Sequence, residues 1–403
     1  GVGGVAGVVF NNSSVTGSYF AGVINGIGSI AGGVAGWLND SGSMVNCYST
    51  GTVNGYNSVG GVVGSVSKSS SVAGSYFTGE VDGYNSVGGV AGEVSTSSVT
   101  GCYSTGAVSG VYISGGVTGS VHNNSAVINC YSTGTVSGTY SYFGGVAGVV
   151  ILSSLTNCYS TGEVIGRSSV GGVVGVVSFS SVFNCYSTGA VSGKSEVGGV
   201  VGVIGDGKVY NCATLNAEVK GDSLTGRVAG RIGNSNSIEY PLANNVAYTG
   251  IKNKDGIFDW ANIGSYDLDG ADITIAEILA DGTIGGRFTA ENGWTIAAGS
   301  LPGLLGNAVS MPAHLGGASV KFSKPSLYSK SSARFISASG RTLRLRLSER
   351  GNVSVYALNG AKLRTFDLAG GSHSLTVNDL PRGMYVVRAV SGSWKQSVRL
   401  TLK

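Results

Sequence analysis

A repeat of about 28 residues constrains this chain more than any other feature of its sequence. Near-copies of the segment NCYSTG recur, and their Cys positions follow one another at steps of 27 to 29 residues. A second marker, GGVxG, keeps the same period from residue 32 to residue 198. One such unit is too short to bury a core by itself, so we predict stacked units that form a solenoid with one coil per repeat. The equivalent motif positions are Ser18, Cys47, Ser75, Cys102, Cys130, Cys158, Cys185 and Cys212.

The composition indicates that the solenoid is all-β. The 403 residues include 70 Gly, and 42% are hydrophobic, with many Val residues that favour strands. Only 5 Pro occur, which leaves the backbone N–H groups available for long ladders. Because parallel connections are overwhelmingly right-handed, we predict a right-handed parallel β-helix with about 28 residues per coil.

Substitutions between the repeats predict which side chains face the core. Where Ser replaces the motif Cys, the residue two positions later changes from Ser to Phe20 or Phe77. Such an exchange of volume within one packed layer places both positions inside the coil. The Tyr and Thr residues that alternate with them should face outward and form a surface contact ladder. These residues are Tyr48, Tyr76, Tyr103, Tyr131, Tyr159, Tyr186, Thr50, Thr78, Thr105, Thr133, Thr161 and Thr188.

The residue before each motif position is always Gly or Asn. These two residue types enter the left-handed backbone region at the lowest cost, so we predict a corner of the coil at this position. The eight residues are Gly17, Asn46, Gly74, Gly101, Asn129, Asn157, Asn184 and Asn211.

The six Cys residues have three interpretations. Buried free thiols are favoured, because Cys alternates with Ser at the same inward position. Disulfides between adjacent coils are an alternative, since the spacing of neighbouring strands falls within the range for a bridge. A ladder of metal ligands is the third, although no His or second Cys shares the coil.

The repeat decays after residue 230. We predict degenerate coils and a C-terminal cap over residues 231–312, including a short helix that Thr274 and Glu277 cap as a box. Trp294 and Leu301 are predicted to plug the end of the core, which protects the open edge of the solenoid from aggregation. Residues 313–333 are rich in Ser, Lys and Gly and are typical of a linker.

The last segment, residues 334–403, alternates apolar and polar residues between Gly-rich turns, which predicts a small antiparallel Ig-like β-sandwich. It is also basic: residues 321–403 carry fifteen Lys or Arg against three Asp or Glu. These charges are scattered between strands and not clustered, so we expect no nucleic-acid partner.

The chemistry of common active sites is missing from the sequence. None of the three His residues, His122, His314 and His373, lies in an HExxH motif, and Asp and Glu are too sparse in the repeats for a paired-carboxylate site. We therefore expect no enzyme activity, no catalytic residues, no metal and no cofactor. No apolar run reaches the roughly 18 residues of a membrane helix, so no transmembrane segment is expected. The chain opens inside a repeat, at GVGGVAG, which suggests a fragment of a longer protein.

Two resemblances extend this interpretation. The recurring GGVxG and NCYSTG of residues 1–230 resemble the GLUG motif, a Gly-rich repeat of bacterial surface proteins. The segments VYALNG and LPRGMYVVRA of residues 334–403 resemble C-terminal sorting domains of type IX secretion. The second resemblance implies export across an outer membrane, with the secretion machinery as a partner. A carbohydrate-binding sandwich is the alternative for this domain.

Together these features predict a secreted or cell-surface, non-enzymatic repeat protein that is adhesin-like or structural. Its ladders would contact a glycan or another cell-surface molecule, because Tyr stacks on sugar rings, and repeated Thr also occurs in ice-binding solenoids. The alternative for the ladders is that Tyr and Thr are simply good strand residues. The alternatives for the whole chain are a carbohydrate-binding accessory module of an extracellular polysaccharide-degrading system, and the stalk of an enzyme whose catalytic domain is missing from this fragment.

Overall fold

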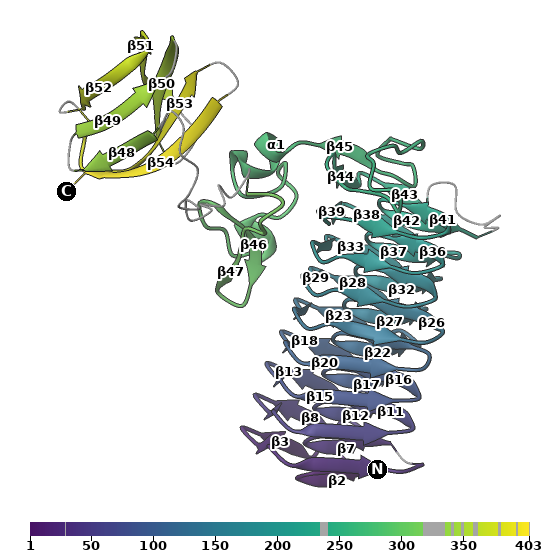
Figure 1. Ribbon diagram of the computed structural model, residues 1–403. Coiled ribbons are helices and arrows are strands. Elements are labelled where there is room, and N and C mark those ends of the chain that lie inside the picture. The colour runs from purple at the N-terminus through teal and green to yellow at the C-terminus, as the bar shows by residue number, and fades with distance from the viewer. Residues whose placement is uncertain are drawn as a thin grey trace. The chain divides into compact units, whose positions relative to one another are not determined.

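The computed structural model describes residues 1–28, 30–233, 241–316, 335–339, 342–347, 350–357, 362–377, 380–391 and 394–402. The chain divides into two compact units, Gly1–Gly317 and Ala318–Lys403. The first unit is a parallel β-solenoid of about nine turns, which confirms the predicted fold class (Figure 1). The handedness of the coil stays a prediction. The predicted linker lies outside the described residues from residue 317 onward.

Five parallel sheets run along the solenoid, and each takes one strand from every full coil. We name each sheet by its first strand. The β1 sheet comprises β1 (Val2–Gly3), β6 (Ala31–Gly32), β11 (Asn57–Gly60), β16 (Asn85–Gly88), β21 (Ser114–Gly115), β26 (Ser141–Gly144), β31 (Ser168–Gly171), β36 (Ser195–Gly198) and β41 (Ser223–Gly226). The β2 sheet comprises β2 (Ala6–Val9), β7 (Ala35–Leu38), β12 (Val63–Ser67), β17 (Ala91–Ser95), β22 (Thr118–His122), β27 (Ala147–Ile151), β32 (Val174–Ser178), β37 (Val201–Ile204) and β42 (Ala229–Ile232).

The other three sheets complete each coil. The β3 sheet comprises β3 (Ser14–Thr16), β8 (Ser43–Val45), β13 (Ser71–Ala73), β18 (Ser98–Thr100), β23 (Ala126–Ile128), β28 (Ser154–Thr156), β33 (Ser181–Phe183), β38 (Lys208–Tyr210) and β43 (Leu242–Ala243). The β4 sheet comprises β4 (Tyr19–Phe20), β9 (Tyr48–Ser49), β14 (Tyr76–Phe77), β19 (Tyr103–Ser104), β24 (Tyr131–Ser132), β29 (Tyr159–Ser160), β34 (Tyr186–Ser187), β39 (Ala213–Thr214), β44 (Val246–Tyr248) and β45 (Ala271–Ile273). The β5 sheet comprises β5 (Val23–Gly26), β10 (Thr52–Gly55), β15 (Glu80–Gly83), β20 (Ala107–Gly110), β25 (Val136–Gly138), β30 (Val164–Ile165), β35 (Val191–Ser192) and β40 (Val219–Lys220).

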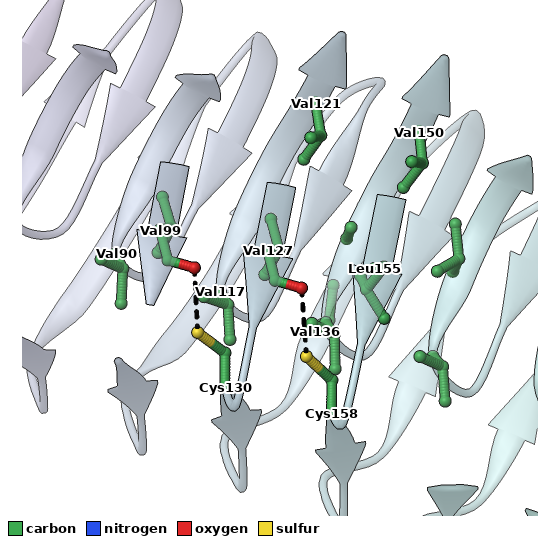
Figure 2. Packing of buried hydrophobic residues seen from close by; sticks show 14 of the residues in the cluster. Val90, Val99, Val117, Val121, Val127, Cys130, Val136, Val150, Leu155 and Cys158 are labelled. Atoms are coloured by element: carbon green, nitrogen blue, oxygen red, sulfur yellow. Dashed lines mark hydrogen bonds between the residues drawn. The ribbon is translucent and has the colours of Figure 1, made fainter. Parts of the chain in front are cut away.

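The motif Cys residues face the core, as the sequence predicted. All six are fully buried free thiols, and none is paired in a disulfide. Figure 2 shows the thiols of Cys130 and Cys158 pointing at the preceding coil, where they donate hydrogen bonds to the carbonyl oxygens of Val99 and Val127 at 3.7 and 3.8 Å. The predicted exchange of volume also holds, because Phe77 and Ser75 are both fully buried.

The GGVxG marker is explained by a close approach across the core. A Cβ on Gly116 would overlap both the hydroxyl oxygen of Ser132 and the carbonyl oxygen of Gly145 in the next coil. Only glycine leaves room for the opposite side of the coil to pack at this distance. The narrow core therefore requires the marker in every repeat.

The predicted corner is confirmed in every coil. All eight Gly and Asn residues that precede the motif position have φ between 52° and 62°, in the left-handed region. The turn into the β4 sheet therefore depends on a residue type that accepts this geometry.

The segment after the last full coil, which we call the cap, lies partly in an unexpected place. It contains α1 (Ile275–Ala280), the 3-10 helix η1 (Ala290–Asn292), and the antiparallel pair β46 (Ser300–Leu304) and β47 (Asn307–Ser310). The predicted capping box is present, because Glu277 N donates to Thr274 Oγ1 and Thr274 N donates to Glu277 Oε2.

The prediction that Trp294 and Leu301 plug the solenoid core is wrong. Both side chains are buried in a separate cluster, against the outward Tyr residues of the β4 sheet. Ile251 belongs instead to the core cluster, and Trp260 and Leu268 pack against it. The chain between β44 and β45 therefore contributes to closing the core, while β46 and β47 lie alongside the coils (Figure 1).

The second unit consists of two antiparallel sheets. One has the order β48 (Phe335–Ser339), β49 (Thr342–Leu347), β52 (Gly371–Thr376), and the other has the order β51 (Lys362–Leu368), β50 (Gly351–Ala357), β53 (Gly383–Ser391), β54 (Trp394–Leu402). Leu343 and Leu345 of the first sheet share one buried cluster with Val353, Val355 and Val387 of the second. This arrangement confirms a small antiparallel sandwich.

In the part of the chain that the structure describes, no helix is long and apolar enough to cross a membrane.

Candidate functional site

The outward Tyr residues of the β4 sheet form one continuous stack. Register pairs Tyr48 with Tyr76 and Tyr76 with Tyr103, and the pattern continues to Tyr186. Neighbouring ring centroids lie 4.8 to 5.2 Å apart, and the rings are within 10° of parallel. Tyr19 extends the stack by one coil, at a position that sequence reasoning left out although it follows the motif Ser18.

This stacking changes what the tyrosines can contact. Each inner ring has a neighbouring ring over both faces, so a sugar reaches only the ring edges and the phenol groups. The expectation that these rings offer their faces to a sugar is therefore not supported. The outward orientation itself is confirmed, because the side chains from Tyr48 to Tyr131 are partly exposed on the outside of the coil.

The cap covers one end of the tyrosine stack. Tyr159 and Tyr186 are 3% and 0% exposed, and the indole of Trp294 lies 6.2 and 5.7 Å from their ring centroids. Phe288 packs edge-on against Tyr186 at 5.4 Å. Burial, together with the neighbouring phenol of Tyr103, raises the pKa of Tyr131 to about 12. Burial likewise raises the pKa of Tyr159 and Tyr186, so these phenols stay neutral.

The Thr ladder lies beside the tyrosines and is more accessible. Thr50, Thr78, Thr105 and Thr133 are exposed, whereas Thr161 is half-buried and Thr188 is buried. Four of the six predicted Thr residues are therefore free to meet a ligand at the surface.

A groove of about 700 Å³ runs between the Thr ladder and the cap. Thr105, Thr133 and Thr161 line one side, and Met311 and Pro312 line the other. A shallower hollow of about 460 Å³ shares Thr105 and continues the path along Thr78 and Thr50. We call this continuous path the threonine groove. It combines a row of hydroxyl groups with an apolar wall, a combination that the sequence did not reveal because the wall comes from the cap.

A second aromatic column lies on another edge of the solenoid, and sequence reasoning missed it. Tyr56, Tyr84, Tyr112 and Tyr140 follow the strands of the β5 sheet in successive coils, with centroid distances of 4.6 to 5.3 Å. Three of them are 37–48% exposed. The signal was the recurrence of Tyr one or two residues after the Gly that ends the strands β10, β15, β20 and β25.

A polar cluster on the solenoid is built from Ser58, Glu93 and His122. His122 Nε2 lies 2.8 Å from Glu93 Oε1, and Ser58 donates to Glu93 Oε2 at 2.7 Å. The His122 interaction, with help from Ser58, lowers the pKa of Glu93 against the opposing effect of burial. Because the serine bonds the carboxylate and not the imidazole, the cluster lacks the nucleophile–base pair of a hydrolase. Within the described ranges, no three His, Cys, Asp or Glu residues gather as a metal site.

The fold and its outward ladders define a β-solenoid repeat protein. Residues 166–192, about one coil, match the family model described as the GLUG motif. This match supports a GLUG repeat protein and agrees with the resemblance carried by GGVxG and NCYSTG. No curated protein matches the chain.

Proposed function

We propose that this chain is a secreted or cell-surface repeat protein without catalytic activity, adhesin-like or structural, which holds an extended glycan in its threonine groove. The observation that carries the proposal is the groove of about 700 Å³ between the Thr ladder and the cap. It presents the same hydroxyl group in successive coils, roughly 4.8 Å apart, opposite an apolar wall.

The chemistry of the groove suits a sugar chain. A sugar carries hydroxyl groups at its edge and C–H groups on its face, so Thr105 and Thr133 would bond the edge while Met311 and Pro312 cover the face. A repeating ligand would meet the same contact in each coil, and such contacts reinforce one another along its length.

Export through residues 334–403 is the second part of the proposal. Their resemblance to sorting domains of type IX secretion supports it, and so does the independent sandwich that the described residues of this segment form. The partner would be the outer-membrane secretion machinery, and the destination would be the bacterial cell surface or the medium.

The groove also favours a second candidate, a carbohydrate-binding accessory module of an extracellular polysaccharide-degrading system. The two candidates use the same surface and differ in the glycan. An adhesin would recognise glycans of a host or neighbouring cell, whereas an accessory module would recognise the polymer that the system degrades.

A glycan array probed with the full chain and two variants tests the proposal. Thr133→Trp places an indole in the groove at an exposed position, so the fold should survive while binding falls. Ser109→Trp, at an exposed position of the β5 sheet that lines neither hollow, is the matched control and should bind as the parent does. Equal binding by both variants would contradict a role for the threonine groove.

A further inference from the structure

One corner of the solenoid holds polar residues in five coils but bulky apolar residues in two neighbouring coils. The corner joins the β2 sheet to the β3 sheet, and its left-handed residues are polar in the first five coils: Asn11, Asn12, Asp40, Ser41, Lys68, Ser69, Thr96, Asn123 and Asn124. In the next two coils the same corner holds Leu152 and Phe179, with φ of 50° and 49°.

Both replacements are unfavourable for the fold alone. Bulky apolar residues resist the left-handed region, which Asn accepts far more easily. Leu152 and Phe179 are also 50% and 57% exposed, so they gain little from burial. Local violations of this kind concentrate at functional sites, because there a ligand contact compensates for the lost stability.

The two side chains stand over a concave surface. One hollow of about 600 Å³ is lined by Leu152, Phe179 and the outer face of the β3 sheet. A second hollow of about 840 Å³ is lined by Tyr210 and Tyr266. The two hollows share Ser181 and Lys208, so they form one groove, which we call the β3 groove.

The floor of the β3 groove presents side chains and no free backbone. Ser154, Ser181 and Lys208 occupy one register position in β28, β33 and β38, and parallel pairing joins these three strands. A peptide therefore cannot add to this sheet as a further strand, because the strands of the floor already pair with each other. Recognition has to use apolar rings, hydroxyl groups and the two charged groups, Asp206 and Lys208.

We propose that the β3 groove binds an oligosaccharide. Phe179 and the face of Tyr210 that does not stack on Phe183 would cover the apolar faces of the sugar rings, and Ser154 and Ser181 would bond their hydroxyl groups. The ammonium group of Lys208 makes no ion pair among the described residues and is exposed, so it is available to donate to a sugar oxygen. This site is separate from the threonine groove, and no residue lines both.

The test measures binding of the full chain by isothermal titration calorimetry. The ligands are five hexasaccharides, of β-1,4-linked glucose, xylose, mannose and N-acetylglucosamine and of α-1,4-linked galacturonic acid. The parent should bind at least one of them. Phe179→Asn and Leu152→Asn install the residue type that other coils use at this corner. Their melting temperatures should therefore stay equal or rise, while the affinity for the bound hexasaccharide falls about tenfold or more.

Two further variants separate binding from folding. Thr96→Asn changes the equivalent single-residue corner outside the groove and should leave the affinity unchanged. Lys208→Gln, at an exposed strand position, should lower the affinity without touching the corner. The proposal is overturned if the parent binds none of the five sugars, or if folded Phe179→Asn and Lys208→Gln both bind as tightly as the parent. Thr133→Trp should leave this binding intact, so failure of the threonine groove and failure of the β3 groove are distinguishable.

Discussion

Tyr186 donates its phenol hydrogen to the carbonyl oxygen of Pro302 at 2.5 Å. The donor belongs to the β4 sheet of the solenoid and the acceptor to β46 of the cap. This bond is fully buried, and it fixes the cap on the side of the coils at the covered end of the tyrosine stack. The position of the threonine groove therefore depends on it.

Tyr186→Phe should loosen the cap and leave the solenoid folded. The change removes one buried hydrogen bond and leaves the Pro302 carbonyl oxygen without this donor, at a cost of about 1–3 kcal/mol. Hydrogen exchange should become faster in residues 271–316 and stay unchanged in the coils before residue 130. Tyr76→Phe, in a coil outside the cap cluster, is the control. Unchanged exchange in the cap would show that ring packing alone holds it.

Asn157→Val should destabilise the chain more than an ordinary surface change. Asn157 has φ of 52°, and its amide donates to the carbonyl oxygen of Asn292 at 3.0 Å. Val loses both the accessible geometry and the bond, so we expect a loss of about 2–3 kcal/mol in the free energy of unfolding. Asn157→Gly keeps the geometry and should lose only about 1 kcal/mol. Equal stability of the Val variant and the parent in chemical denaturation would refute the corner argument.

The buried thiols of Cys102 and Cys130 should make stability fall at alkaline pH. Burial is the main cause that raises the pKa of Cys102 and Cys130 well above the ordinary value of 9.0. Above pH 9 the unfolded thiols lose their protons while the folded ones keep them, so unfolding becomes more favourable as pH rises. The stabilising contribution is complete below pH 9. Cys130→Ser, which copies Ser18 and Ser75, should show a smaller loss of melting temperature between pH 8 and pH 10.5. An equal loss in both proteins would assign the effect to other groups.

Deleting residues 334–403 should block export and leave the solenoid folded. The described strands of this segment form their own buried cluster, which contains no residue of the solenoid. In a bacterial host with type IX secretion, the truncated chain should accumulate in the periplasm with an unchanged circular dichroism spectrum. Fractionation with immunoblotting measures its location. Appearance of the truncated chain in the medium at the parental level would remove the sorting proposal.

The repeat made the solenoid predictable because each position is sampled many times. In one repeat Ser75 and Phe77 replace the Cys and Ser of the other repeats, and this exchange revealed the inward face. The restriction of the residue before the motif position to Gly and Asn revealed the corner. The cap occurs once, so its sequence contains no such comparison. Trp294 was correctly expected to be buried, but its partners, the rings of Tyr159 and Tyr186, depend on tertiary docking. The threonine groove was missed for the same reason, since its apolar wall of Met311 and Pro312 comes from the cap. The β3 groove was missed although Leu152 and Phe179 stand in the repeats, because its concave shape appears only when neighbouring coils stack.

The parallel register makes the length of each surface column proportional to the number of repeats. Each added or deleted repeat changes the length of every surface column by roughly one strand spacing of 4.8 Å and leaves the chemistry of the column unchanged. Because the cap covers the tyrosine column at a fixed end, through Tyr159 and Tyr186, extra coils inserted before residue 100 would lengthen the open part alone. Selection on repeat number could therefore match the reach of this surface to the length of a polymer without any new contact residue.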